Sequence, residues 1–455
     1  MDTKKLRQKI LDLAIRGKLV PQDPNDEPAS VLLERIRAEK ERLINEGKIK
    51  RSKKSAPSDT PHYENVPFEV PEGWVWCRLS EIANYGGGKT PSMDNKQYWS
   101  NGTNLWITSK DMKCERITDS MMKISNDALD IMTQYEPGTL LMVTRSGILR
   151  HSLPIAILEE KATVNQDLKT ISLHLKETHE YVYYAIKARE RYILKEYHKD
   201  GTTVDSINFE KFAEILLPIP PYDEQKRIVI AIKKWLSFID QLEQNANELE
   251  TSIQQTKKKI LEFAMHGKLV PQDPNDEPAI ELLKRINPKF TPCDNAHYEN
   301  VPSNWAVCKL EDIINYEQPQ EYIVQSTDYK THHKTPVLTA GKSFIIGYTN
   351  EDFGICSNLP VIIFDDFTTD SKYVDFPFKV KSSAMKILHV NEDVNIQYVC
   401  WFMSITRLVG DTHKRYWISE YSKLHIPIPP RNEQDRIINK VNELFQILDN
   451  ISAEL

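Results

Sequence analysis

Apolar residues recur in alternating steps of four and three over a long stretch near the middle of the chain. The stretch runs from Tyr222 to His266 without glycine or proline, and Asp223 is the expected N-cap. Its apolar positions are Ile228, Ile232, Trp235, Ile239, Leu242, Ala246, Leu249, Ile253, Thr256, Ile260 and Phe263. This heptad spacing predicts a long helix that packs along another helix. At 1.5 Å per residue, roughly 45 residues make a rod on the order of 65 Å long.

The same apolar pattern occurs a second time, divided between the two ends of the chain. Its members are Ile437, Val441, Leu444, Leu448, Ile451 and Leu455, continued by Leu6, Ile10 and Leu13. One interpretation is a coiled-coil arm that joins two copies of the chain. The internal repeats favour another interpretation, an antiparallel helix pair within one chain.

These repeats bracket two variable regions. Thirteen consecutive residues, Gly17 to Ala29, recur unchanged from Gly267 to Ala279. Shorter matches follow: His62–Pro67 with His297–Pro302, Gly73–Leu79 with Asn304–Leu310, and Ile219–Ile228 with Ile428–Ile437. By these offsets Leu455 corresponds to Ala246 and Met1 to Thr251, so the repeat is circular. We therefore expect a pseudo-two-fold molecule whose chain ends meet.

The variable regions mix strand-like and helix-like segments, which predicts an α+β protein with two mixed α/β domains. Strands are expected at Leu140–Thr144, Pro154–Leu158, Thr170–Leu175 and Pro360–Phe364, and helices at Glu180–Tyr197 and Ile396–Leu408. The expected order is an N-terminal helical segment (1–45), a flexible linker (46–70), the first domain (71–221), the central helix and following segment (222–286), a linker (287–302), the second domain (303–430) and the C-terminal helix (431–455). Two long antiparallel helices are expected to separate the domains.

Composition narrows the class of protein. We see neither a secretory signal nor an apolar run of membrane-spanning length, so the expected location is the cytoplasm and no membrane partner is expected. The six cysteines are scattered, without the paired spacing of a zinc site, so no metal is predicted and they should be buried. The formal net charge is −6.

The paired Pro-Ile-Pro-Pro-x-x-Glu-Gln-x-Arg-Ile strings (Pro218–Ile228 and Pro427–Ile437), the Gly-Lys-Leu-Val-Pro-Gln segments and the heptad helices together resemble the specificity subunits of type I restriction-modification systems. The resemblance covers essentially the whole chain. It implies a non-catalytic subunit whose two target-recognition domains each read one half of a split DNA sequence. It also implies partners: double-stranded DNA, methylation subunits, expected as two, and restriction subunits. No cofactor is expected in this chain, because S-adenosylmethionine, ATP and Mg²⁺ would be bound by the partner subunits.

The resemblance carries over no individual DNA-reading residue, so candidates come from chemistry. In the first domain, a glycine-rich run with Lys89 could approach phosphate, aromatic and polar groups suit a groove, and an arginine on a loop suits guanine. These candidates are Gly87, Lys89, Thr90, Tyr98, Trp106, Ser109, Lys110, Thr144, Arg145 and Ser146. The second-domain candidates are Lys330, His332, His333, Lys334, Lys414, Arg415 and Tyr416. Each cluster could equally be a solvated loop or a core aromatic. The expected coiled-coil and partner-docking positions are Ile228, Trp235, Leu242, Leu249, Ile437, Leu444 and Leu448.

Three enzyme signatures are incomplete. A Walker A loop ending in Gly88-Lys89-Thr90 has Ala83 in place of its first glycine. The Ile219-Pro220-Pro221-Tyr222 string has isoleucine where an adenine methyltransferase needs an Asn or Asp acceptor. Acidic and lysine groups such as Glu159-Glu160-Lys161 are too common to indicate a nuclease. The alternatives left are a coiled-coil scaffold or a stand-alone specificity subunit without productive DNA reading, and a self-sufficient methyltransferase.

Overall fold

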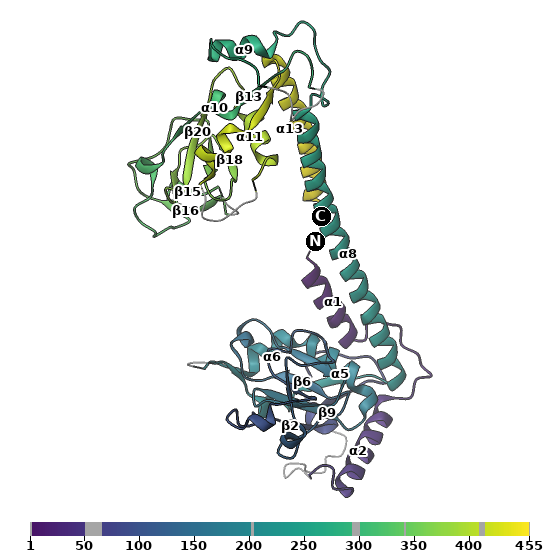
Figure 1. Cartoon of the computed structure of the whole chain (residues 1–455). Coiled ribbons are helices and arrows are strands. Elements are labelled where there is room, and N and C mark those ends of the chain that lie inside the picture. Colours follow the sequence, from purple (N-terminus) through teal and green to yellow (C-terminus); the bar gives the residue numbers. More distant parts are fainter. Residues whose placement is uncertain are drawn as a thin grey trace. The chain divides into compact units, whose positions relative to one another are not determined.

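The structure is a computed structural model that describes residues 2–50, 66–201, 204–293, 301–340, 343–408 and 415–454. The chain forms two compact units, Met1–Gln244 and Asn245–Leu455. Each unit contains a globular head and a pair of helices (Figure 1). We call residues 71–221 the first head and residues 303–430 the second head. Among the described residues, no helix is both long enough and apolar enough to cross a bilayer.

The long helix predicted from the heptad pattern is α8 (Tyr222–Met265), which runs across the boundary between the two units. It begins at Tyr222, so Asp223 lies in its first turn and is not the N-cap that we expected. After its end, Gly267 has a φ of +64°, and the N–H of Lys268 donates to the carbonyl of Phe263 at 2.9 Å. This left-handed glycine is a common way to end a helix.

In the first unit, α1 (Thr3–Ile15) lies along the first part of α8 (Figure 1). Arg7 of α1 binds Asp240 at 2.6 Å and Glu243 at 2.8 Å, whereas Gln22, beyond α1, binds Glu224. Sequence numbers therefore rise along one helix as they fall along the other, so the pair is antiparallel. A second helix, α2 (Ala29–Asn45), follows the repeated segment.

In the second unit, α13 (Arg431–Ala453) lies along the last part of α8 (Figure 1). The Lys257 ammonium pairs with Asp449, and Ser452 donates to Glu250 at 2.6 Å. The helices are again antiparallel, and Ile253 between them is 3% exposed. Each unit thus contains an antiparallel pair that includes part of α8, in agreement with the prediction of pairing within one chain. The pseudo-two-fold relation and the meeting of the chain ends stay predictions, and Met1 and Leu455 lie outside the described residues.

The first head contains two sheets. One has the strand order β2-β9-β6-β7-β4 and the other β5-β3-β8, while β1 pairs with β12. The elements are β1 (Val75–Arg78), α3 (Leu79–Ile82), β2 (Ala83–Gly87), η1 (Lys96–Tyr98), β3 (Asn104–Ile107), β4 (Arg116–Ile117), β5 (Met122–Ile124), α4 (Asn126–Leu129), β6 (Leu140–Val143), η2 (Gly147–Arg150), β7 (Ile155–Leu158), β8 (Ala162–Val164), β9 (Leu168–Leu173), η3 (Lys176–Thr178), α5 (His179–Ala188), α6 (Glu190–Tyr197), β10 (His198–Lys199), β11 (Ser206–Ile207), α7 (Phe209–Phe212) and β12 (Leu216–Ile219).

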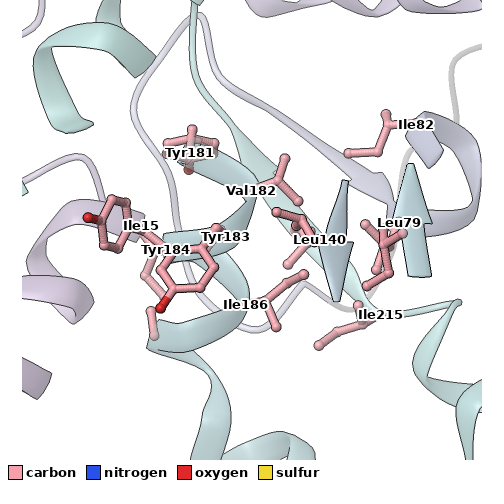
Figure 2. Close-up of a cluster of buried hydrophobic side chains, with 14 of the residues drawn as sticks. Ile15, Leu79, Ile82, Leu140, Tyr181, Val182, Tyr183, Tyr184, Ile186 and Ile215 are labelled. Carbon is pink, nitrogen blue, oxygen red and sulfur yellow. The ribbon is translucent and has the colours of Figure 1, made fainter. Parts of the chain in front are cut away.

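Helix α5 connects the sheet of the first head to the helix pair. Figure 2 shows Val182 and Ile186 of α5 on the side of Leu140 in β6, and Tyr184 toward Ile15 of α1. The cluster continues to Ile228 and Ile232 of α8, which are 0% exposed. The first head and its helices therefore share one hydrophobic core, and burial of this apolar surface holds the head on the helices.

The second head has sheets of the order β14-β20-β17-β18 and β16-β15-β19, while β13 pairs with β21. Its elements, with the helix that precedes it, are α9 (Ala279–Ile286), β13 (Ala306–Lys309), α10 (Leu310–Ile313), β14 (Ile314–Glu317), η4 (Gln320–Tyr322), β15 (Thr335–Leu338), β16 (Ile345–Thr349), β17 (Val361–Asp365), β18 (Ser371–Val374), β19 (Lys379–Val380), β20 (Met385–Val390), α11 (Ile396–Ile405), α12 (Tyr416–Ser419), η5 (Tyr421–Lys423) and β21 (His425–Ile428).

The two heads repeat one topology. In both, a central strand (β6 or β17) lies between two antiparallel neighbours, and the second sheet contains one parallel pair (β3 with β8, β15 with β19). The two-strand closures have the same antiparallel register, Cys77 opposite Leu217 and Cys308 opposite Ile426. The predicted α+β fold with duplicated domains is confirmed.

Two local predictions need correction. The helix expected at Glu180–Tyr197 is interrupted at Arg189, whose side chain is buried and donates to the carbonyl of Leu216 at 2.5 Å. Of the six cysteines, Cys114 is exposed and Cys293 half-buried, so the expectation of general burial is wrong for these two. Linker residues 51–65 and 294–300 lie outside the described part of the chain.

Candidate functional site

In each head, the connection between the first sheet and the second carries polar residues that the sequence singled out. It comprises residues 88–103 between β2 and β3 in the first head and residues 318–334 between β14 and β15 in the second. We call these the first and second connections. Because the heads share one topology, the two connections occupy equivalent places in their domains.

The glycine run before the first connection serves close packing. A Cβ at Gly88 would lie 1.6 Å from the carbonyl oxygen of Val164, and one at Gly86 would lie 2.3 Å from the Tyr135 hydroxyl. The N–H of Gly87 donates to that hydroxyl at 2.9 Å, and the hydroxyl donates to the Gly87 carbonyl at 2.7 Å. The expected role of Gly87 as a phosphate donor is therefore wrong, because its N–H is already used within the sheet.

Lys89 and Thr90 at the start of the first connection are exposed. Thr90 donates to Gln166 at 2.7 Å, and the Trp106 indole N–H donates to the Lys89 carbonyl at 3.2 Å. Because the Lys89 main chain is fixed from inside the head, its ammonium group is presented to solvent from a defined position.

Aromatic residues of the first connection pack with Trp106 of β3 into a small core. Trp106 is 6% exposed, and its ring centroid lies 5.1 Å from that of Trp99 in an edge-on contact. Tyr98 is half-buried and packs against the same cluster. Trp106 is thus a core residue and not the groove contact that the sequence suggested. The large exposed apolar side chains in this part of the head include Met93 and Met121, which sequence reasoning did not select.

The loop after β6 exposes the arginine chosen as a guanine reader. Thr144 is buried, and its N–H donates to the Asp167 carbonyl at 2.8 Å. The Arg145 side chain is exposed, while its main chain forms a β-bridge with Ser206. Ser146 caps the next turn by accepting from the N–H of Ile148 at 3.4 Å. Thr144 and Ser146 therefore support the loop, and Arg145 projects from it.

The second candidate loop of the first head follows β3. The Asp111 carboxylate accepts from the N–H and the hydroxyl of Thr108, both at 2.8 Å, which closes a tight turn. Within this turn Ser109 is half-buried and Lys110 is exposed. The turn thus presents the Lys110 ammonium to solvent.

The second connection holds its basic residues against the hairpin of β15 and β16. The N–H of Lys330 donates to the Tyr348 carbonyl at 3.1 Å, and Nδ1 of His333 lies 3.2 Å from the same oxygen. His332 stacks edge-on against His333 and is exposed, as are Lys330 and Lys334. The connection therefore presents two ammonium groups and an imidazole to solvent.

The other second-head cluster is only partly described. Lys414 lies outside the described residues. Arg415 is exposed, and its guanidinium lies 5.9 Å from the centroid of the Phe367 ring. Tyr416 is 4% exposed and belongs to the core of the head, so its expected role as a DNA contact is wrong.

The helices carry a repeated stripe of exposed apolar side chains. On α8 it consists of Trp235, Phe238 and Leu242, which are 46%, 43% and 47% exposed. The equivalent positions of α13, each 209 residues later, are Leu444, Ile447 and Ile451, of which Leu444 is half-buried and the other two are exposed. Exposed apolar groups aligned on one helix face are typical of a surface that binds a partner. The sequence predicted Trp235, Leu242, Leu444 and the half-buried Leu448 for this role.

Three other residues that were predicted to dock a partner lie outside the stripe. Ile228 and Ile437 are 0% exposed because each lies in the core of its own head, so they cannot contact a partner. Leu249 is 41% exposed on the part of α8 that belongs to the second unit.

A duplicated polar clamp joins each head to its helices. In the first unit, the Glu224 carboxylate accepts from Trp74 Nε1 at 2.9 Å and from Gln22 Nε2 at 2.6 Å. In the second unit, Glu433 accepts from Trp305 at 3.0 Å and from Gln272 at 2.7 Å. These carboxylates are 1% and 0% exposed, and burial raises the pKa of each above its ordinary value.

An ion pair accompanies each clamp. Arg227 binds Asp26 in the first unit, with one N–H···O distance of 3.1 Å, and Arg436 binds Asp276 in the second at 2.6 Å. Gln22 and Asp26 both belong to the thirteen repeated residues, as do their counterparts Gln272 and Asp276. The unchanged repeat is therefore the part of the chain that fastens the head to the helix in each unit.

The family model described as "Type I restriction modification DNA specificity domain" matches residues 71–251. The EcoAI specificity subunit of the type I restriction enzyme of Escherichia coli is 28% identical, over 97% of this chain and 89% of that protein. The EcoEI specificity subunit of Escherichia coli is 32% identical, over 68% of this chain and 62% of that protein. The chain belongs to the type I specificity subunits. A solved chain from a study of assembly and conformational transition of a type I restriction-modification system has the same fold, with a TM-score of 0.55 and 13% identity over 85% of this chain and 94% of that one.

As a specificity subunit, the chain is a DNA-recognition component and not a catalytic one. Near-matches to enzyme motifs have structural roles in this specificity subunit. Glu159 pairs with Arg116, and Lys161 pairs with Glu136 at 2.9 Å.

Sequence reasoning missed one cluster of potential metal ligands in the specificity subunit, formed by His198, Asp200 and Asp205. Asp205 is already bound by Arg150 at 2.6 Å, and this hydrogen bond lowers the pKa of its carboxyl group. The cluster therefore has a guanidinium where a metal ion would need a free carboxylate. His198 lies in β10 and Asp205 directly precedes β11, so the cluster forms only when these two strands pair. No sequence motif indicates this arrangement.

Proposed function

We propose that this specificity subunit reads a bipartite DNA site, with each head contacting one half. The observation that carries the proposal is the duplication of one topology, in which equivalent connections present exposed cationic groups. If the two heads contacted different partners, there would be no reason for both connections to expose cationic groups at equivalent places. The proposal assigns sequence reading to the heads and their spacing to the helices.

The residues proposed to contact DNA are those that the heads expose from fixed main-chain positions. In the first head they are Lys89, Thr90, Lys110 and Arg145, and in the second Lys330, His332, Lys334 and Arg415. Ammonium groups suit phosphates, whereas an arginine fork can bind the O6 and N7 acceptors of guanine. Arg145 is the proposed base reader because its side chain is exposed on a loop whose main chain is held by hydrogen bonds.

The apolar stripes are the proposed docking surfaces for methylation subunits. Trp235, Phe238 and Leu242 recur as Leu444, Ile447 and Ile451 at the same spacing, which favours two equivalent partners. Restriction subunits are proposed to join the same assembly. S-adenosylmethionine, ATP and Mg²⁺ are assigned to these partners, and the proposed place of action is the cytoplasm.

Footprinting of the chain together with a methylation subunit tests the proposal. Protection of two separated half-sites is the expected result, and exchange of the first head for that of a relative should change one half-site alone. Complex formation without any preferred DNA sequence would instead support the scaffold alternative. Methyl transfer by the purified chain alone would support the self-sufficient methyltransferase.

A further inference from the structure

The second head contains a fully buried lysine at a strand position where the first head has no charged residue. Lys379 of β19 is 0% exposed. Its ammonium group donates to the carbonyls of Phe353 at 2.8 Å and Gly354 at 3.1 Å, and it pairs with Glu351 at 3.1 Å. An isolated buried charge is very costly, so these partners are what make its burial tolerable.

The first head shows that the strand itself does not need a charge at this place. β19 runs parallel to β15, with Lys379 opposite Val337, and β8 runs parallel to β3, with Thr163 opposite Trp106. The N–H of Lys381 donates to the Leu338 carbonyl, as the N–H of Asn165 donates to the Ile107 carbonyl, so Thr163 is the equivalent of Lys379. Thr163 is 0% exposed and uncharged, and its hydroxyl donates to the Leu105 carbonyl at 3.0 Å. The equivalent strand is therefore built without an ion pair in one head and with one in the other, so the pair serves something particular to the second head.

The partner of Lys379 holds the second connection. One oxygen of Glu351 accepts from the main-chain N–H groups of Gln325 and Ser326, both at 2.9 Å, and the other oxygen faces Lys379. These two N–H groups begin the segment 325–334, which carries Lys330, His332 and Lys334. Glu351 thus connects a fully buried cation to the start of the exposed segment.

The middle of segment 325–334 is fixed separately by contacts with the β15–β16 hairpin. The N–H of Lys330 donates to the Tyr348 carbonyl, and a Cβ at Gly347 would lie 2.4 Å from that of Tyr329. The β15–β16 hairpin therefore holds the middle of the segment, while the Glu351 carboxylate holds its beginning. Loss of one attachment would leave the other in place and let the segment shift without unfolding the head.

We propose that Lys379 and Glu351 form a positioning pair that sets the second connection for reading its half of the DNA site. This inference rests on the proposed function, because it assumes that segment 325–334 contacts DNA. Neither residue touches DNA itself in this proposal. They act through the position of Lys330, His332 and Lys334.

The test measures DNA binding by the full chain with a methylation subunit, on the cognate site and on sites with either half scrambled. Lys379→Met should weaken binding to the cognate site by about tenfold or more, the order expected when one set of polar contacts is misplaced. The loss should persist when the first half-site is scrambled and disappear when the second is scrambled. Binding that does not depend on the second half-site in the unaltered protein would instead reject the proposed function.

A double variant separates positioning from stability. Lys379→Met leaves the largely buried Glu351 carboxylate without its cation and lowers the unfolding temperature. Lys379→Met with Glu351→Met removes both charges and should recover much of this loss. Reading of the second half-site should stay lost in the double variant. Tyr398→Phe removes the buried hydrogen bond to the Pro427 carbonyl, 2.8 Å long, and serves as a destabilised control that keeps its reading. Normal reading by the double variant, or failure of both variants to fold, would overturn the positioning role.

Discussion

At the scale of single residues, the most informative feature is a carboxylate that is buried twice in the same surroundings. Glu224 and Glu433 each accept from one tryptophan and one glutamine, so both oxygens face donors. An amide in place of the carboxylate would turn an NH₂ group toward one of those donors. The carboxylate is therefore required by hydrogen bonding even though burial disfavours its charge.

Replacement of this carboxylate should destabilise the protein. Glu224→Gln loses one of the two hydrogen bonds and leaves a buried donor unsatisfied, a cost of about 1–3 kcal/mol. The free energy of unfolding in urea measures the loss. Glu433→Gln should behave alike in the other unit, whereas Asp223→Asn, at an exposed position one residue away, should have little effect.

The stability difference between the unaltered protein and Glu224→Gln should also depend on pH. Burial raises the folded-state pKa of Glu224 above the ordinary value of 4.5, so the folded state binds a proton more readily than the unfolded state. The contribution of Glu224 is then fully present below the unfolded pKa and falls as pH rises through the folded pKa. Urea unfolding from pH 4 to pH 7 tests this sign. A difference that grows with pH would contradict it.

Arg145 provides a test of base reading by one side chain. Because it projects from a loop held by Ser206 and Asp167, Arg145→Ala should cost about 1–3 kcal/mol of binding and relax one base position in one half-site. A selection of bound sequences from a random pool measures the preference. Uniform weakening on all sequences would assign Arg145 to a phosphate, and Lys110→Ala is the matched comparison for such a contact.

The exposure of loop residues such as Lys89, Lys110 and Arg145 could be predicted from the sequence, whereas the burial of residues inside the heads could not. Trp106 and Tyr416 look like contact residues in a linear sequence, but each is buried in a hydrophobic cluster of its head. Gly87 looks like a phosphate cradle, but Tyr135, far away in sequence, occupies its N–H. Lys379 was not selected because a lysine within a short strand gives no sign that it is buried.

At the scale of elements, the helices were the most predictable part of the molecule. A helix of 44 residues repeats its apolar period often enough to be identified, and glycine and proline mark its end. The strands are short, commonly four residues or fewer, so their pairing depends on contacts between distant segments. Their existence could be predicted in places, whereas the order within the sheets could not.

The repeated stripe leads to a prediction about helix surfaces. Trp235→Glu with Phe238→Glu should weaken binding of one methylation subunit strongly, because exposed aromatic anchors commonly contribute 2 kcal/mol or more, and Leu444→Glu with Ile447→Glu should weaken the second. Analytical ultracentrifugation with purified methylation subunits would show the loss as a change in stoichiometry. Gln241→Glu, at an exposed position of α8 outside the stripe, adds one of the two negative charges of a double variant and should leave assembly intact. Full assembly of both double variants would place docking elsewhere.

At the scale of the whole molecule, the circular repeat accounts for why two dissimilar heads share one architecture. The clamp residues, the antiparallel helix pairs and the order of strands recur in both units, whereas Lys379 and Thr163 differ at equivalent places. The duplication could be predicted because thirteen unchanged residues are visible in the sequence. The divergence between heads could not, since it lies in contacts between residues far apart in the chain.

Helix α8 is continuous across the boundary between the two units, so its length should affect the distance between the half-sites. Seven residues inserted between Gln244 and Asn247 would lengthen the helix by about 10 Å while nearly preserving its angular register, because seven residues make about two turns. The heads and their clamps would be unchanged, so both half-sites should stay the same while the spacer between them lengthens by about three base pairs at 3.4 Å each. Mapping of methylated adenines in DNA from cells that carry the variant measures the spacer directly. An unchanged spacer would mean that α8 does not set the distance between the half-sites. A change in the half-site sequences would mean that the heads are not independent of the helix.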